Sequence, residues 1–132
     1  MKRTLAVITF ALFAATGLTS PSIAAENTVA GMGTFEGASN HITTGGVSII
    51  KTAGGGAVVI LDADFSLDGA PDPHVGFGTD GTYAQASDIG MLSSNSGLQV
   101  FVVPASVNVD DFNEVYIWCS DVGVPLGVAT IN

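Results

Sequence analysis

The chain has 132 residues, of which 47% are hydrophobic and only 11% charged, and its formal net charge is −9. This length suits a single domain with one hydrophobic core. The acidic excess argues against nucleic acid and anionic membrane surfaces as partners, because both attract positive charge.

Residues 1–25 have the features of a cleaved signal peptide. Met1–Thr4 is basic, Leu5–Leu18 is apolar, and small residues precede Ala25, as a signal peptidase requires. The apolar stretch is too short to cross a bilayer, and no cysteine near the cleavage region accepts a lipid. We therefore expect a periplasmic or secreted protein with no membrane insertion after cleavage. The mature chain would keep one lysine, Lys51, against 12 acidic residues, a net charge of −11.

Residues 31–132 predict an all-β domain, a single antiparallel β-sandwich. Short β-branched stretches alternate with turn clusters about every ten residues, and helical periodicity is absent. TAGGG at 52–56 would close a hairpin between the first two strands. AVVIL and VYIWC are apolar on both faces, which indicates central strands or strands with a ligand groove outside. The predicted strands are His41–Lys51, Ala57–Phe65, His74–Gly78, Leu98–Val103, Glu114–Cys119 and Val124–Ile131, with a weaker one near Thr34.

The acidic loop at 62–72, DADFSLDGAPD, partly matches a calcium-binding loop. Asp64, Ser66 and Asp68 alternate and Gly69 stands sixth, as in an EF-hand. However, Val75 occupies the position that requires a bidentate glutamate, and strands flank the loop. The pattern favours an ordinary acidic turn, with cation binding as the open alternative.

Motifs for catalysis are few. The chain has no G-x-S-x-G elbow, and His41 and His74 are the only histidines that could act as a base. No helix follows a glycine-rich loop, so the glycines indicate turns and bulges. An enzyme with its own substrate turnover is therefore the least favoured of the three function classes that we distinguish.

Cys119, in VYIWCS, is the only cysteine. Strand alternation places Val115, Ile117 and Cys119 on one face and the two aromatic residues between them on the other. A free cysteine is commonly a small buried hydrophobe. In an oxidising compartment it also finds disulfide partners, so a dimer through Cys119 is one possibility. A reactive thiolate needs nearby positive charge, which a bound metal or haem iron would supply.

The ligands available for such a metal are few. Two histidines, a methionine and a cysteine make a blue-copper set on paper, but neither histidine nor methionine follows Cys119 in the sequence. The haem motif C-x-x-C-H is also absent. Three alternatives remain open: a bound haem, a bound copper-type metal, or no cofactor. Cys119, His41 and His74 are the residues that would bind a haem or a metal.

Landmarks across the mature chain resemble a known family. They are GTFEG with Phe35, SNHITTGG with His41, the DADF strand end, APDPHV, DIGML, GLQVFVVP and VYIWCSDVGVPLGVATI. Together they resemble the electron-transfer DM-thirteen domain, and the last segment, with its single cysteine, is the most specific. Ala70 and Leu126 stand where the family more often has Gly and Phe, and neither departure touches the cysteine.

The resemblance implies a DOMON-like β-sandwich with a redox role centred on Cys119. That residue would act as a bare thiol or as a ligand to a prosthetic group, and a redox partner protein is implied. The alternative is an exported cation- or glycan-binding module without redox chemistry. Pro71–Asp72 and Trp118 are expected to be structural.

Overall fold

The computed structural model describes residues 16–21 and 25–132. Over these residues it is all-β, as predicted, and its only helical segments are two single 3-10 turns, η1 (Gln85–Ser87) and η2 (Val109–Asp111). No helix in the described part of the chain has the length and hydropathy needed to cross a membrane. Most of the predicted signal peptide lies outside the described residues. The strands are β1 (Thr28–Gly37), β2 (Thr43–Thr44), β3 (Gly46–Lys51), β4 (Ala57–Leu61), β5 (Ser66–Leu67), β6 (Pro73–Thr79), β7 (Thr82–Tyr83), β8 (Gly90–Met91), β9 (Gln99–Val103), β10 (Glu114–Cys119) and β11 (Val124–Thr130).

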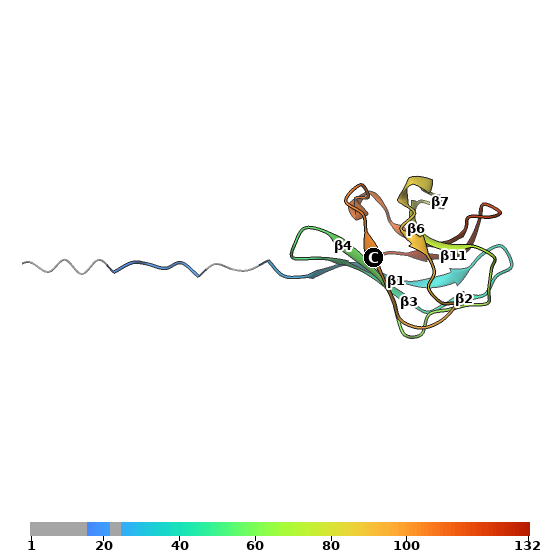
Figure 1. Ribbon diagram of the computed structural model, residues 1–132, viewed down its shortest axis with the longest axis horizontal. Helices are drawn as coiled ribbons and strands as arrows, with labels where there is room; N and C mark the ends of the chain where they lie inside the picture. Colours follow the sequence, from blue (N-terminus) through green and yellow to red (C-terminus); the bar gives the residue numbers. More distant parts are fainter. Residues whose placement is uncertain (1–15, 22–24) are drawn as a thin grey trace, which may run out of the picture.

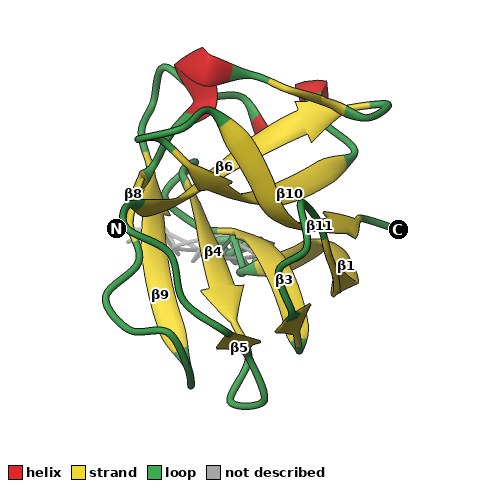
Figure 2. Ribbon diagram, turned by 90° about the vertical axis from the view of Figure 1, so that its right-hand side faces the viewer, coloured by secondary structure: helices red, strands yellow, loops and turns green. Residues whose placement is uncertain are grey.

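These strands form one curled antiparallel sheet and a separate small pair. The order in the large sheet is β7-β6-β10-β11-β1-β3-β4-β9, with β8 also paired to β6, while β2 pairs with β5. The sheet folds over so that β6, β10 and β11 form one layer and β3, β4 and β9 the other (Figures 1 and 2). Strand β1 joins the layers, because residues 28–34 pair with β3 and residues 35–37 pair with β11. The predicted β-sandwich is confirmed.

The hydrophobic core lies between the two layers. In β4, Ala57, Val59 and Leu61 are buried while the residues between them are half-exposed, the alternation expected of a strand with one covered face. The opposite layer contributes inward-facing residues in the same way. The larger core residues include Val47, Ile49, Phe65, Val75, Phe77, Phe101, Val115, Ile117 and Leu126.

Two of the predicted strands are shorter than expected: the first begins later and the second ends earlier. The stretch 41–51 contains β2 and β3 separated by Gly45, whose φ of +100° interrupts the strand, so His41 lies in the preceding turn. Strand β4 stops at Leu61 because the amide of Phe65 turns back to the carbonyl of Asp62. The predicted hairpin at 52–56 is confirmed by the registered pairing of β3 with β4.

Candidate functional site

Cys119 ends the central strand β10 and faces the core. Its neighbours in register are Pro73 of β6 and Val124 of β11, and only 1% of its surface is exposed. Val115 and Ile117 are buried on the same face, as alternation predicted. The thiol is free and not part of a disulfide.

The turn after Cys119 reaches the surface at once. Residues 121–123 are exposed, and the amide of Gly123 donates to the carbonyl of Cys119 over 2.8 Å. The amide of Ser120 donates to the carbonyl of Asp72 over 3.0 Å. The buried sulfur therefore belongs to a residue directly before an exposed hairpin turn.

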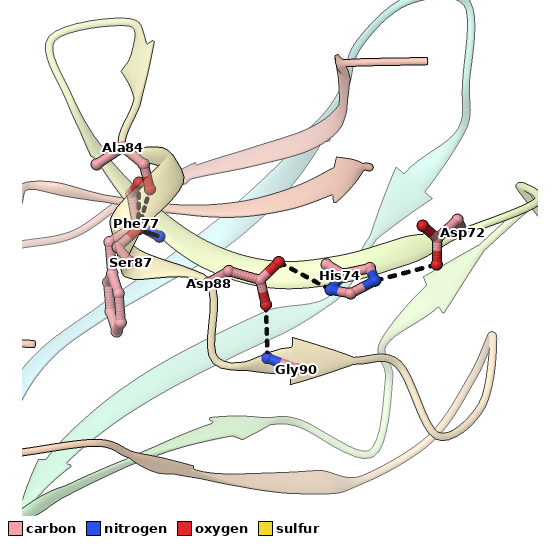
Figure 3. A network of polar contacts seen from close by, with 7 residues as sticks. All are labelled: Asp72, His74, Phe77, Ala84, Ser87, Asp88 and Gly90. Carbon is pink, nitrogen blue, oxygen red and sulfur yellow. Dashed lines mark hydrogen bonds and ion pairs between the residues drawn. The ribbon is translucent and has the colours of Figure 1, made fainter. Parts of the chain in front are cut away.

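His74 lies in β6 between two carboxylates (Figure 3). Its Nε2 is 3.0 Å from Oδ1 of Asp72, and its Nδ1 is 2.8 Å from Oδ2 of Asp88. The Nδ1 contact lacks regular hydrogen-bond geometry, so we treat it as an ion pair. Burial by itself lowers the pKa of His74, but Asp88 and Asp72 together outweigh burial and the pKa is raised above its ordinary value. The two carboxylates thus favour the protonated form of His74 more than water does.

The same network fixes the elements around β6. Oδ1 of Asp88 accepts from the amide of Gly90 in β8 over 2.9 Å. The Ser87 hydroxyl accepts from the amide of Phe77 over 2.8 Å, and its single proton lies within reach of the carbonyl oxygens of Ala84 and Phe77, at 2.6 and 2.9 Å (Figure 3). These bonds attach η1 and β8 to the edge of β6.

His41 and the carboxylates of the acidic loop at 62–72 contact each other and the neighbouring backbone. Nδ1 of His41 lies 2.9 Å from Oδ1 of Asp68, and this histidine lowers the pKa of Asp68. Oδ1 of Asp64 accepts from the amide of Gly46 over 2.9 Å. Asp64 and Asp68 of the acidic loop therefore stabilise the local backbone conformation.

The three predicted ligands do not come together. Cys119 points into the core, whereas His74 is in register with Trp118, whose side chain lies on the outer face. Both ring nitrogens of His74 already face carboxylates. Among residues 16–21 and 25–132, no three His, Cys, Asp or Glu side chains are grouped to hold one metal ion. This arrangement does not fit a metal or haem-iron site built from Cys119, His41 and His74, so we derive no chemistry through such a group.

Sequence reasoning missed an aromatic cluster on the outer face of β6 and β10. The rings of Tyr83 and Trp118 stack with centroids 4.2 Å apart at 10°, and Tyr116 meets both edge-on. A Cβ at Gly76 would lie 2.7 Å from the Tyr83 ring, and one at Gly78 would overlap the ring of Tyr116. The alternation of glycines in PHVGFGT was the available signal, since it leaves one face of β6 bare.

A groove runs beside this cluster, with a volume of about 560 Å³. We call it the aromatic groove, and its walls include Tyr83, Glu114, Tyr116, Trp118, Pro125 and Val128. Burial and the nearby Asp88 carboxylate raise the pKa of Tyr83 to about 12. The pKa of Tyr116 is also raised, mainly by burial and to a smaller extent by Glu114. Both phenols therefore stay neutral at physiological pH.

The sequence profile of the electron-transfer DM13 family matches residues 34–131. The chain belongs to this family. The match covers most of the chain and every strand from β2 to β11, which confirms the resemblance found in the sequence. Searches of curated proteins and of solved structures found no match. Membership in this electron-transfer family indicates a redox role and, in general, a redox partner.

Proposed function

We propose that the protein is an exported electron-transfer domain, periplasmic or secreted, whose redox group is the Cys119 thiol. The observation that carries this assignment is the position of the sulfur. It is free, it ends the central strand of a DM13 domain, and it adjoins an exposed turn. The histidines that would make it a metal ligand are held in separate ion pairs. A bare thiol therefore accounts for the geometry better than a ligand role.

The chemistry of a single thiol is exchange with a disulfide on another molecule. The sulfur of Cys119 attacks one sulfur of the partner's disulfide, an interchain S–S bond forms, and the partner's S–S bond breaks. The proton of the Cys119 thiol ends on the leaving sulfur. In this mixed disulfide the Cys119 sulfur is oxidised and the leaving sulfur is reduced, and the partner stays linked to Cys119. A small thiol such as reduced glutathione then attacks the Cys119 sulfur and releases the partner with both of its sulfurs reduced. A second glutathione attacks the glutathione sulfur now bound to Cys119, which regenerates the thiol and forms oxidised glutathione, so two electrons pass from the small thiols to the partner without a bound cofactor.

Burial makes this exchange dependent on motion. The thiol of a residue that is 1% exposed is reached only when its surroundings open, and the exposed residues 121–123 follow it closely in the chain. The same burial disfavours a disulfide between two folded copies, because both turns would have to open at once. A partner with a basic docking surface would be attracted by the mature net charge of −11, which follows from one lysine and 12 acidic residues.

The test is to incubate the mature protein with oxidised glutathione and measure the intact mass and the circular dichroism. The proposal predicts one glutathione per chain, removed by reduced thiol, with the β spectrum unchanged. A Cys119→Ser variant should take up none. If the wild-type protein gains glutathione only in denaturant, the thiol has no redox access and the proposal is wrong.

A further inference from the structure

The aromatic groove contains a buried carboxylate that no cation of the described chain neutralises. Glu114, at the start of β10, is only 7% exposed. Its Oε1 accepts from the amide of Gly81 over 2.6 Å, while its Oε2 is buried without a hydrogen bond of regular geometry. The neutral phenol of Tyr116 lies close enough for Glu114 to raise its pKa, but it brings no positive charge. Burying a carboxylate without a counter-charge costs free energy, so this position is suited to an external cation.

The sources of positive charge in the described residues are engaged elsewhere. Lys51 is their only Lys or Arg, and its Nζ lies 2.6 Å from Oδ2 of Asp110. His41 and His74 lie against Asp68 and against Asp72 and Asp88. None of the groove-lining residues is basic. The charge of Glu114 therefore acts on whatever enters the groove.

The remaining walls select the kind of cation. Tyr116, Trp118, Pro125 and Val128 present mostly apolar surface beside the carboxylate. Aromatic faces attract organic cations, and an apolar lining strengthens the field of a nearby charge. A strongly hydrated metal ion gains little from such walls, and Glu114 is the only carboxylate that lines them.

We propose that the aromatic groove binds a small organic cation, a primary alkylammonium group whose N–H donors turn toward Glu114 and whose alkyl chain lies along Trp118 and Val128. This site is on the outer face of the sheet, opposite Cys119, and does not depend on the redox assignment. It differs from a glycan site, because the recognition is by charge.

The experiment uses the one tryptophan of the chain, Trp118, as the reporter. The mature protein is titrated with n-butylammonium while the tryptophan fluorescence is recorded, and n-butanol and methyl glucoside serve as neutral ligands. We expect saturable binding of butylammonium in the millimolar range and no response to either neutral ligand. Equal binding of the sugar or the alcohol would overturn the proposal, as would the absence of a saturable response to butylammonium.

Two variants test the role of the carboxylate. Glu114→Gln keeps an acceptor for Gly81 and removes the charge, so binding should weaken by about tenfold or more. Asp121→Asn is the matched control, because Asp121 is exposed in the turn beyond the other end of β10. Unchanged binding in Glu114→Gln would contradict the proposal. If that variant does not fold, Val128→Lys places a cation at the groove wall and should abolish binding; retained binding there would also contradict it.

Discussion

Cys119 and His74 lie at the same end of two paired strands but on opposite faces of the sheet. Cys119 is in register with Pro73 and points into the core, and His74 is in register with Trp118 on the outer face. The sheet therefore separates the thiol from the imidazole. A substitution of either residue tests its own role without removing a contact of the other.

The ion pairs of His74 predict a pH-dependent stability. Its folded pKa is raised above the unfolded value of about 6.5, so its contribution is fully present below that value and is lost as pH rises through the folded pKa. The urea midpoint of the wild type should therefore fall as the pH rises above about 6.5. His74→Gln should remove most of this fall, whereas His41→Gln should keep it. A pH dependence that survives in His74→Gln would show that other groups cause it.

The stacked pair of Tyr83 and Trp118 should stabilise the fold cooperatively. With ring centroids 4.2 Å apart at 10°, a double-mutant cycle of Tyr83→Leu and Trp118→Leu should give a coupling free energy of about 0.5–1.5 kcal/mol. Urea unfolding of the four proteins measures it. Strictly additive losses would mean that the rings pack on the sheet without contributing to each other.

Gly78 should tolerate no side chain. A Cβ there overlaps the Tyr116 ring and the backbone carbonyl of Thr82, so Gly78→Ala should lower the free energy of unfolding by about 1–3 kcal/mol. Gly54→Ala is the control, since Gly54 has open space around it and no positive φ. Equal midpoints for the two variants would mean that the ring moves aside without cost.

The main strands were predictable because their β-branched alternation is local. The same alternation correctly placed Cys119 with Val115 and Ile117. Strand β1 was recognised only near Thr34, because its glycines conceal a ten-residue strand that pairs first with β3, across a bulge, and then with β11. The ion pair of His74 with Asp88 could not be predicted from the sequence, because it depends on how η1 and β8 fold back against β6. Glu114 was also missed, because a free carboxylate oxygen is a property of packing and not of sequence spacing.

Opening of the turn after Cys119 should respond to its backbone geometry. Gly123 has a φ of +69°, which strains any other residue, so Gly123→Ala should destabilise this turn in particular. The exchange rate of Cys119 with an aromatic disulfide reagent should rise in Gly123→Ala. Gly54→Ala, in the other hairpin, should leave the rate unchanged.

The most direct test of the account is whether Cys119 reacts through local opening or only after global unfolding. The measurement is the rate of disulfide exchange at Cys119 in the native protein and in Val59→Ala, a core substitution in β4 of the facing layer that should destabilise the whole fold by about 0.5–3 kcal/mol. We predict equal native rates in the two proteins, because the 120–123 turn opens without unfolding the core. A rate that rises in Val59→Ala in proportion to its unfolding equilibrium constant would show that the sulfur is inaccessible in the folded state, and would contradict a redox role for Cys119.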